Sequence, residues 1–171
     1  MYISHKSNTI QQIHGVEWEC RRLTKGLTKP EYWTWLESVT SGDPPVSDFS
    51  GEDYEIIETN APLSYESTVD GVTRTISFYE SGHIHEDGTY SLKWDATKKE
   101  IVKDDTAKAA WELAEEWKQI RAERTRLLAE TDYMGNSDVT MSADWKTYRK
   151  SLRDLPADQS SKTKYSDITW P

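Results

Sequence analysis

The segment SGHIHEDGTY contains two histidines separated by one residue, which is the spacing of a possible metal-ligand pair. His83 and His85 alternate along a predicted strand, so both side chains would point to one face of it, as H-x-H ligands do. A cupin-like site also needs an acid several residues further on and another histidine, whereas here Glu86 is adjacent and Asp87-Gly88 predicts a hairpin turn. We therefore expect a solvated strand end, no metal site and no cofactor.

The second chemical candidate is Cys20, the only cysteine. Arg21 and Arg22 follow it and would lower the pKa of its thiol, but no histidine adjoins it. The chain has no G-x-S-x-G elbow and no P-loop or G-x-G-x-x-G for phosphate. With 30 acidic residues, no carboxylate pair stands out as a general acid and base. These patterns predict a buried structural thiol in a protein that is not an enzyme.

The composition limits the partners of this chain. Its 171 residues allow one or two domains, and its net charge of -9 disfavours nucleic acid and anionic lipid. No apolar run reaches the length of a membrane span, and the polar opening MYISHKSNTIQQ lacks a signal-peptide core, so we expect use without secretion and no membrane contact. Eight Trp and nine Tyr must build either the core or a binding face.

The elements that would position these residues begin with a short helix from about Lys29 to Val39. Thr28 and Glu31 have capping-box spacing, and Pro30 suits a first turn. The helical stripe Tyr32, Trp33, Leu36 and Val39 is typical of a face packed on a core.

Period-two patterns follow, in the runs YEIIET, VTRTISFY, TYSLKW and KEIV between Tyr54 and Val102. They predict an antiparallel meander of three or four strands, with turns at Asp70-Gly71 and Asp87-Gly88. One face of VTRTISFY is largely apolar, so the sheet needs a cover. The long helix that follows is the candidate cover.

That helix is predicted from about Thr106 to Glu130, after the favourable acidic pair Asp104-Asp105. Its length of about 37 Å exceeds what a small sheet covers, so part of its apolar stripe should meet a second helix or a partner. The stripe consists of Ala110, Leu113, Trp117, Ile120 and Leu127.

The second helix is predicted to start after the cap Ser142 and to stop at Pro156. Its apolar groups are Trp145, Tyr148 and Leu152, and a helix of about 11 residues must dock to persist. The chain then ends on Ile168, Trp170 and Pro171, which we expect to be tied down on the domain or on a partner.

Arg149 and Arg153 lie one helical turn apart on this second helix, so both project from one side. Asp132, Asp138 and Asp154 are acidic partners within reach of a folded-back hairpin. Two interpretations stay open: the ion pairs brace the turn between the helices, or these side chains contact a partner directly, because Trp, Tyr and Arg dominate interface hot spots.

The pattern R-x-x-L-L-x-x-T-D, then W-x-x-Y-R-x-x-L-R-D-L, then W-P resembles the C-terminal module of bacteriophage tail assembly chaperone and tail-fibre assembly proteins. The matching positions are Arg124, Leu127, Leu128, Thr131, Asp132, Trp145, Tyr148, Arg149, Leu152, Arg153, Asp154, Leu155, Trp170 and Pro171. The resemblance implies a non-enzymatic protein of a tailed phage that acts on another tail protein in the cytoplasm of the infected bacterium.

These observations predict an α+β fold with a short N-terminal helix, a small antiparallel sheet, a long helix and a C-terminal helical hook. Residues 1–103 would form an α+β region, and residues 104–171 a helical module with an extended C-terminus. The expected partner is a phage tail, tail-fibre or baseplate protein, and homo-oligomerisation within a tail is left open. The expected contact residues are Arg124, Asp132, Tyr133, Trp145, Tyr148, Arg149, Leu152, Arg153, Asp154 and Trp170.

Three roles fit this reading. The first is a tail or tail-fibre assembly chaperone that shields a subunit until it trimerises or polymerises. The second is a virion component in the tail, baseplate or fibre that uses the C-terminal module as a docking hook. The third is a carbohydrate-binding tail module, but Trp33, Trp111, Trp117 and Trp145 fall in predicted helices, which favours packing and protein contact.

Overall fold

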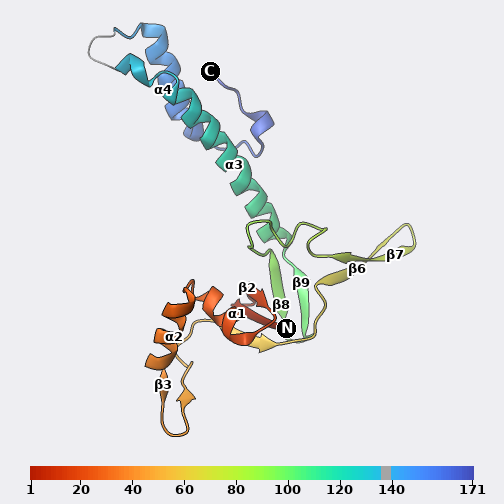
Figure 1. Cartoon of the computed structure of the whole chain (residues 1–171). Coiled ribbons are helices and arrows are strands. Elements are labelled where there is room, and N and C mark those ends of the chain that lie inside the picture. The colour runs from red at the N-terminus through yellow and green to blue at the C-terminus, as the bar shows by residue number, and fades with distance from the viewer. Residues whose placement is uncertain (136–139) are drawn as a thin grey trace. The chain divides into compact units, whose positions relative to one another are not determined.

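A computed structural model describes residues 1–135 and 140–171 of the chain, and it divides them into two compact units. The first unit comprises Met1–Lys108 and the second Ala109–Pro171. Helices and antiparallel sheets are both present, so the predicted α+β class is confirmed (Figure 1). No helix in the described part of the chain is long and apolar enough to cross a membrane.

The strands all belong to the first unit. They are β1 (Tyr2–Lys6), β2 (Thr9–His14), β3 (Thr40–Ser41), β4 (Val46–Ser47), β5 (Glu55–Glu58), β6 (Ser64–Val69), β7 (Val72–Ser77), β8 (Leu92–Asp95) and β9 (Glu100–Lys103). The helices are α1 (Glu17–Thr24), α2 (Lys29–Ser38), α3 (Asp105–Ala129) and α4 (Ala143–Asp158), with 3₁₀ turns η1 (Asp132–Gly135) and η2 (Tyr165–Asp167).

The predicted meander is wrong in its connections. The main sheet has five antiparallel strands in the order β5-β1-β2-β8-β9, so two N-terminal strands lie in its middle. The sequence does not predict these strands, because the opening segment is mostly polar. They form a hairpin through the two-residue turn Ser7-Asn8, whose φ angles of 48° and 66° give the turn the twist that hairpins favour.

Strands β6 and β7 form a separate two-stranded ribbon outside the main sheet. Their two-residue turn is Asp70-Gly71, as the sequence predicts, and both residues have positive φ angles. The ribbon ends at Ser77, and the next residue, Phe78, is fully buried in the core of the main sheet. The run VTRTISFY therefore contributes to that core mainly through the residue that follows its strand.

The core of the first unit forms where the N-terminal hairpin meets β8 and β9. It consists of Ile3, Ile10, Phe78, Leu92, Trp94 and Ile101, all nearly inaccessible to solvent. Helix α1, which the sequence patterns did not predict, packs against β1, β2 and β5. It buries Cys20, together with Arg21, whose guanidinium pairs with the buried carboxylate of Glu52.

Helix α2 begins as the sequence predicts. Thr28 accepts a hydrogen bond from the Glu31 N–H at 3.5 Å, and the Glu31 carboxylate accepts one from the Thr28 N–H at 2.8 Å, which completes the capping box. Of the predicted stripe, Tyr32 is buried but Trp33 is exposed. Trp33 packs beside Trp18 of α1, with ring centres 5.2 Å apart, rather than entering the core.

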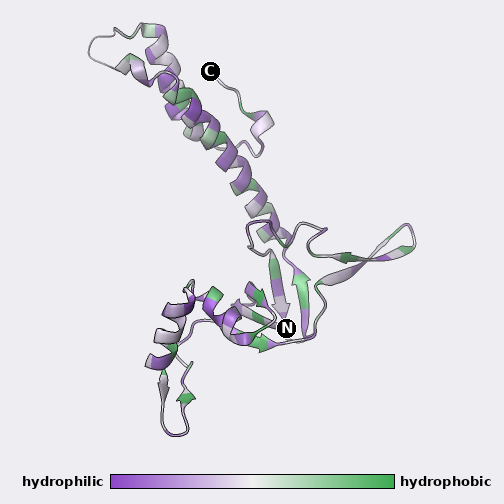
Figure 2. Cartoon of the chain, in the orientation of Figure 1, coloured by the Kyte–Doolittle hydropathy of each residue, from purple (hydrophilic) through white to green (hydrophobic). Residues whose placement is uncertain are grey.

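Helices α3 and α4 lie close to their predicted positions. Asp104 caps α3 by accepting from the Ala107 N–H at 3.1 Å, and Ser142 caps α4 by accepting from the Trp145 N–H at 3.3 Å. The prediction that α4 stops at Pro156 is wrong, since the helix continues to Asp158. Figure 2 shows that α3 is mainly hydrophilic, with apolar residues at intervals.

Candidate functional site

The second unit is a helical hairpin with a small core of its own. Ile120 of α3 and Leu155 of α4 are buried together with Ile168 of the C-terminal segment. Trp117 and Trp170 pack against this cluster. The apolar stripe of the long helix therefore meets the second helix of the same chain, which was one of the two predicted outcomes.

Arg149 of α4 braces the end of α3. Its Nη1 donates to the carbonyl oxygen of Leu128 at 3.0 Å and to the hydroxyl of Thr131, and its Nη2 donates to Asp132 Oδ1 at 2.7 Å. The fork of the guanidinium thus holds the last turn of one helix and the turn that follows it. Of the two interpretations left open for Arg149, the structure shows the bracing contact.

The C-terminal segment is tied back onto the hairpin by polar contacts that the sequence patterns did not reveal. The side-chain amide of Gln159 donates to the Thr169 carbonyl at 2.6 Å and accepts from the Thr169 N–H at 2.8 Å. The N–H of Tyr165 donates to Glu116 Oε2 at 2.6 Å. Together with buried Ile168, these contacts hold the aromatic end of the chain on its own domain. A glutamine and a glutamate on helix surfaces carry no pattern that predicts this pairing.

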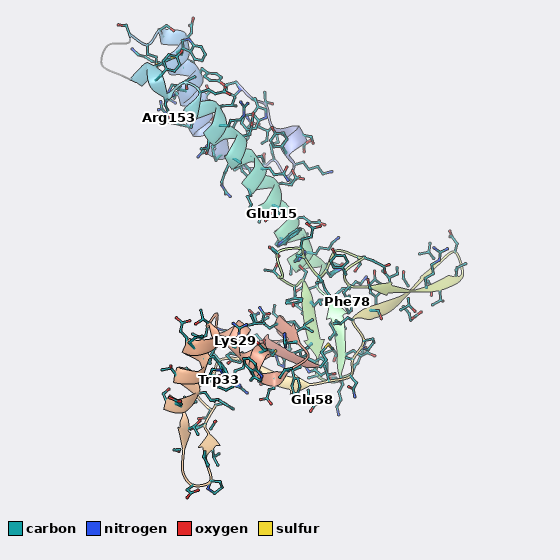
Figure 3. All side chains as sticks on the ribbon, viewed as in Figure 1. Lys29, Trp33, Glu58, Phe78, Glu115 and Arg153 are labelled. Carbon is teal, nitrogen blue, oxygen red and sulfur yellow. The ribbon has the colours of Figure 1, made fainter. Side chains whose placement is uncertain are left out.

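Aromatic and basic side chains stay at least partly exposed in the turn before α4 and along α4. Trp145 and Tyr148 form an edge-to-face pair with ring centres 5.5 Å apart, and 41% of Trp145 is exposed. Tyr133, in the turn between the helices, is 58% exposed. Arg153 is also exposed and makes no hydrogen bond or ion pair with residues 1–135 or 140–171 (Figure 3). We call Tyr133, Trp145, Tyr148 and Arg153 the hook surface.

Most of the other expected contact residues are engaged within the second unit itself. Leu152 is fully buried, and Trp170 packs on the hairpin core. Asp154 accepts a hydrogen bond from Lys150 of its own helix. Arg124 is half-buried, and its shielded Nε finds no hydrogen-bond partner within the described part of the chain. Asp138, the third acidic residue considered for the brace, lies outside the described residues.

The histidines of the SGHIHEDGTY segment are buried, so the expectation of a solvated strand end is wrong. His83 is 3% exposed, with Nε2 3.0 Å from Asp105 Oδ1 and Nδ1 2.9 Å from the Ser81 hydroxyl. His85 Nε2 lies 2.7 Å from the hydroxyl of Ser91. Both ring nitrogens of His83 are satisfied, and its bond to Asp105 fastens the loop between β7 and β8 to the start of α3.

Cys20 is buried, as the sequence predicts, and its sulfur lies 3.7 Å from the Tyr2 carbonyl oxygen. Burial raises the pKa of its thiol, which disfavours the reactive thiolate. Within residues 1–135 and 140–171, no three His, Cys, Asp or Glu side chains gather as a metal site would require.

These features define the second unit as a braced two-helix module with a latched C-terminal segment. Residues 117–171 match a family described as phage tail assembly chaperone protein. The match covers most of α3, all of α4 and the C-terminal segment, and it confirms the resemblance found in the sequence for this module. No curated protein and no solved structure gives a significant match to the chain.

Proposed function

We propose that this protein is a non-enzymatic chaperone of phage tail assembly that binds another tail or tail-fibre protein through the hook surface. The observation that carries the proposal is the family match over residues 117–171, which spans the second half of α3, all of α4 and the latched C-terminal segment. In this role the protein shields its client in the cytoplasm of the infected bacterium until the client trimerises or polymerises.

The geometry supports a division of labour between two arginines one helical turn apart. Arg149 is occupied by the brace, while Arg153 has no partner within residues 1–135 or 140–171. Arginine and aromatic side chains are the residues most often found at interface hot spots, and Trp145 and Tyr148 precede Arg153 on the same helix. The brace holds the surface, and the free side chains contact the client.

The binding test uses purified full-length protein and each tail, fibre and baseplate protein of the same particle. Trp145→Ala and Arg153→Ala should each weaken the complex by a few kcal/mol, as truncation of interface hot spots does. Lys118→Ala is the matched control, because Lys118 is an exposed cation on α3 that pairs with Glu115 of its own helix. Wild-type affinity in both hook variants would refute the hook surface as the binding site.

The second candidate role is a virion component in which the same module is a docking hook. Counting the protein per particle by quantitative mass spectrometry of purified virions and of infected-cell lysate separates the two roles. Abundance in lysate with absence from particles supports the chaperone. A fixed small copy number per virion would overturn the chaperone role and establish an adaptor.

A further inference from the structure

Strand β9 leaves one side of its backbone unpaired. It is an edge of the five-stranded sheet, and within residues 1–135 and 140–171 it pairs with β8 alone. Just beyond the ends of the two strands, the Asp104 N–H donates to the Ser91 carbonyl at 2.9 Å, so Ser91 and Asp104 form a hydrogen-bonded pair of the β8–β9 ladder. Since successive residues of a strand direct their N–H and C=O groups to opposite sides, Val102 faces β8 while Ile101 and Lys103 direct theirs to the free side.

Strand β6 has a free side as well. It pairs with β7 alone, and the Phe78 N–H donates to the Leu63 carbonyl at 3.0 Å. The same alternation directs the backbone groups of Tyr65 to β7 and those of Ser64 and Glu66 away from it. Both β6 and β9 belong to the first unit (Figure 1).

These two free edges line the same groove, which has a volume of about 450 Å³. Its walls are Pro62, Ser64, Tyr65 and Glu66 on one side and Glu100, Ile101, Val102 and Lys103 on the other. The Lys103 ammonium lies 4.2 Å from the centre of the Tyr65 ring, so one flexible side chain joins the two walls. We call this groove the β6–β9 slot.

We propose that the β6–β9 slot binds an extended segment of a partner protein, which adds to β9 as a sixth strand. An extended peptide presents N–H and C=O groups that can pair with the free backbone groups of Ile101 and Lys103. Strand addition to a free sheet edge is an established way of binding peptides. This site lies in the first unit and does not rest on the assembly role proposed for the hook surface.

The charges of the slot favour a partner segment that carries basic residues. Glu66 and Glu100 are exposed on its two walls, in a chain of net charge -9. Pro62, Tyr65 and Val102, none of which is fully buried, supply apolar surface between them. A strand in which apolar and basic residues alternate would place its apolar side chains on that surface and its cations near the two glutamates.

A second copy of this chain is a poorer occupant. Antiparallel pairing of two β9 strands about Val102 puts Glu100 opposite Asp104 of the other copy, and pairing about Lys103 puts two lysines opposite each other. Pairing about Ile101 puts Lys99 opposite Lys103 of the other copy. Like charges directly opposite each other destabilise a sheet, so the charge pattern favours a different protein.

The test measures fluorescence anisotropy of a fluorescein-labelled peptide of alternating valine and lysine with the full-length protein. Saturable binding is expected below about 1 mM. Glu66→Lys with Glu100→Lys should weaken it about tenfold, as two lost opposite-charge contacts would. Lys103→Pro should weaken it about fivefold, because proline lacks the N–H that points into the slot but costs no bond to β8. Thermal unfolding of each variant shows that it is folded.

Two controls separate strand addition from simple charge attraction. A peptide methylated on alternate backbone nitrogens keeps its charge but cannot donate, and it should not bind. Glu58→Lys, on the opposite edge strand β5, should leave binding unchanged. Equal binding of the methylated peptide, equal weakening by Glu58→Lys, or no saturable binding of the parent peptide would overturn the proposal. A concentration-dependent dimer abolished by Lys103→Pro would also overturn it, in favour of a second copy.

Discussion

Replacing Arg149 by alanine should destabilise the α3–α4 hairpin by about 2–4 kcal/mol. The bonds to the Leu128 carbonyl and the Thr131 hydroxyl contribute about 1 kcal/mol each. The ion pair with Asp132 adds about 0.2–1 kcal/mol, because the aspartate is well exposed. The remainder is lost packing, since only 14% of the Arg149 side chain is accessible.

The assay must report on the hairpin rather than on the whole chain, because the two units can unfold separately. Hydrogen exchange of the α4 amides, followed by mass spectrometry, measures the local opening free energy. The expected change in Arg149→Ala is an acceleration of about 30- to 700-fold. Arg149→Lys should give an intermediate value, because an ammonium keeps the charge but cannot span the acceptors as the guanidinium fork does.

Arg153→Ala is the matched control for this prediction. Arg153 lies one turn away on the same helix and makes no hydrogen bond or ion pair within the described part of the chain, so its loss should change exchange by less than about threefold. Exchange in Arg149→Ala within about threefold of the wild-type rate would refute the assignment of Arg149 to the brace. A large effect of Arg153→Ala would refute its assignment to a free surface.

Three further outcomes are expected. Gln159→Ala should release the C-terminal segment, because Thr169 loses both backbone hydrogen bonds to that side chain, and trypsin cleavage at Lys162 and Lys164 should then be faster than in wild type. Asp104→Asn should lower stability by about 0.5–1 kcal/mol near neutral pH, because asparagine can still cap α3 but loses the ion pair with Lys93 and the charge at the helix N-terminus. The ion pair with Lys93 and the helix N–H groups lower the pKa of Asp104, so its stabilisation is present above about pH 4 and is lost as the pH falls through that lowered value. The unfolding curves of the two proteins should converge there. Cys20 should react with a thiol reagent at the rate of unfolding, and reaction within the mixing time in the native protein would contradict its burial.

Local patterns were sufficient to predict elements whose stability depends on neighbours in the sequence. The capping box of α2, the cap at Ser142, the long helix α3 and the turn at Asp70-Gly71 all involve residues within a few positions of one another. Such contacts form in the same way in almost any tertiary surroundings. The motif of the C-terminal module was recognisable for the same reason, and the family match confirms it.

Pairings between distant segments were not predictable in this way. The opening segment forms the central hairpin of the main sheet because Ile3 and Ile10 reach a core completed by Phe78 and Ile101, far along the chain. A strand of five or six residues with only two apolar side chains gives little signal until those partners are known. The burial of His83 was not predictable for the same reason, because its ring bonds to Asp105, which lies far along the chain.

The sequence by itself determined the class of fold, the boundaries of α2 and α3, the start of α4 and the identity of the C-terminal module. The tertiary structure alone decided which strands are neighbours, which of the two arginines is occupied and where the chain end rests. Arg149 and Arg153 have equivalent places in the helical repeat, and only the position of the α3 carboxyl end assigns one to the brace. A helix pattern specifies which side chains share a face, but contacts across space specify what that face meets.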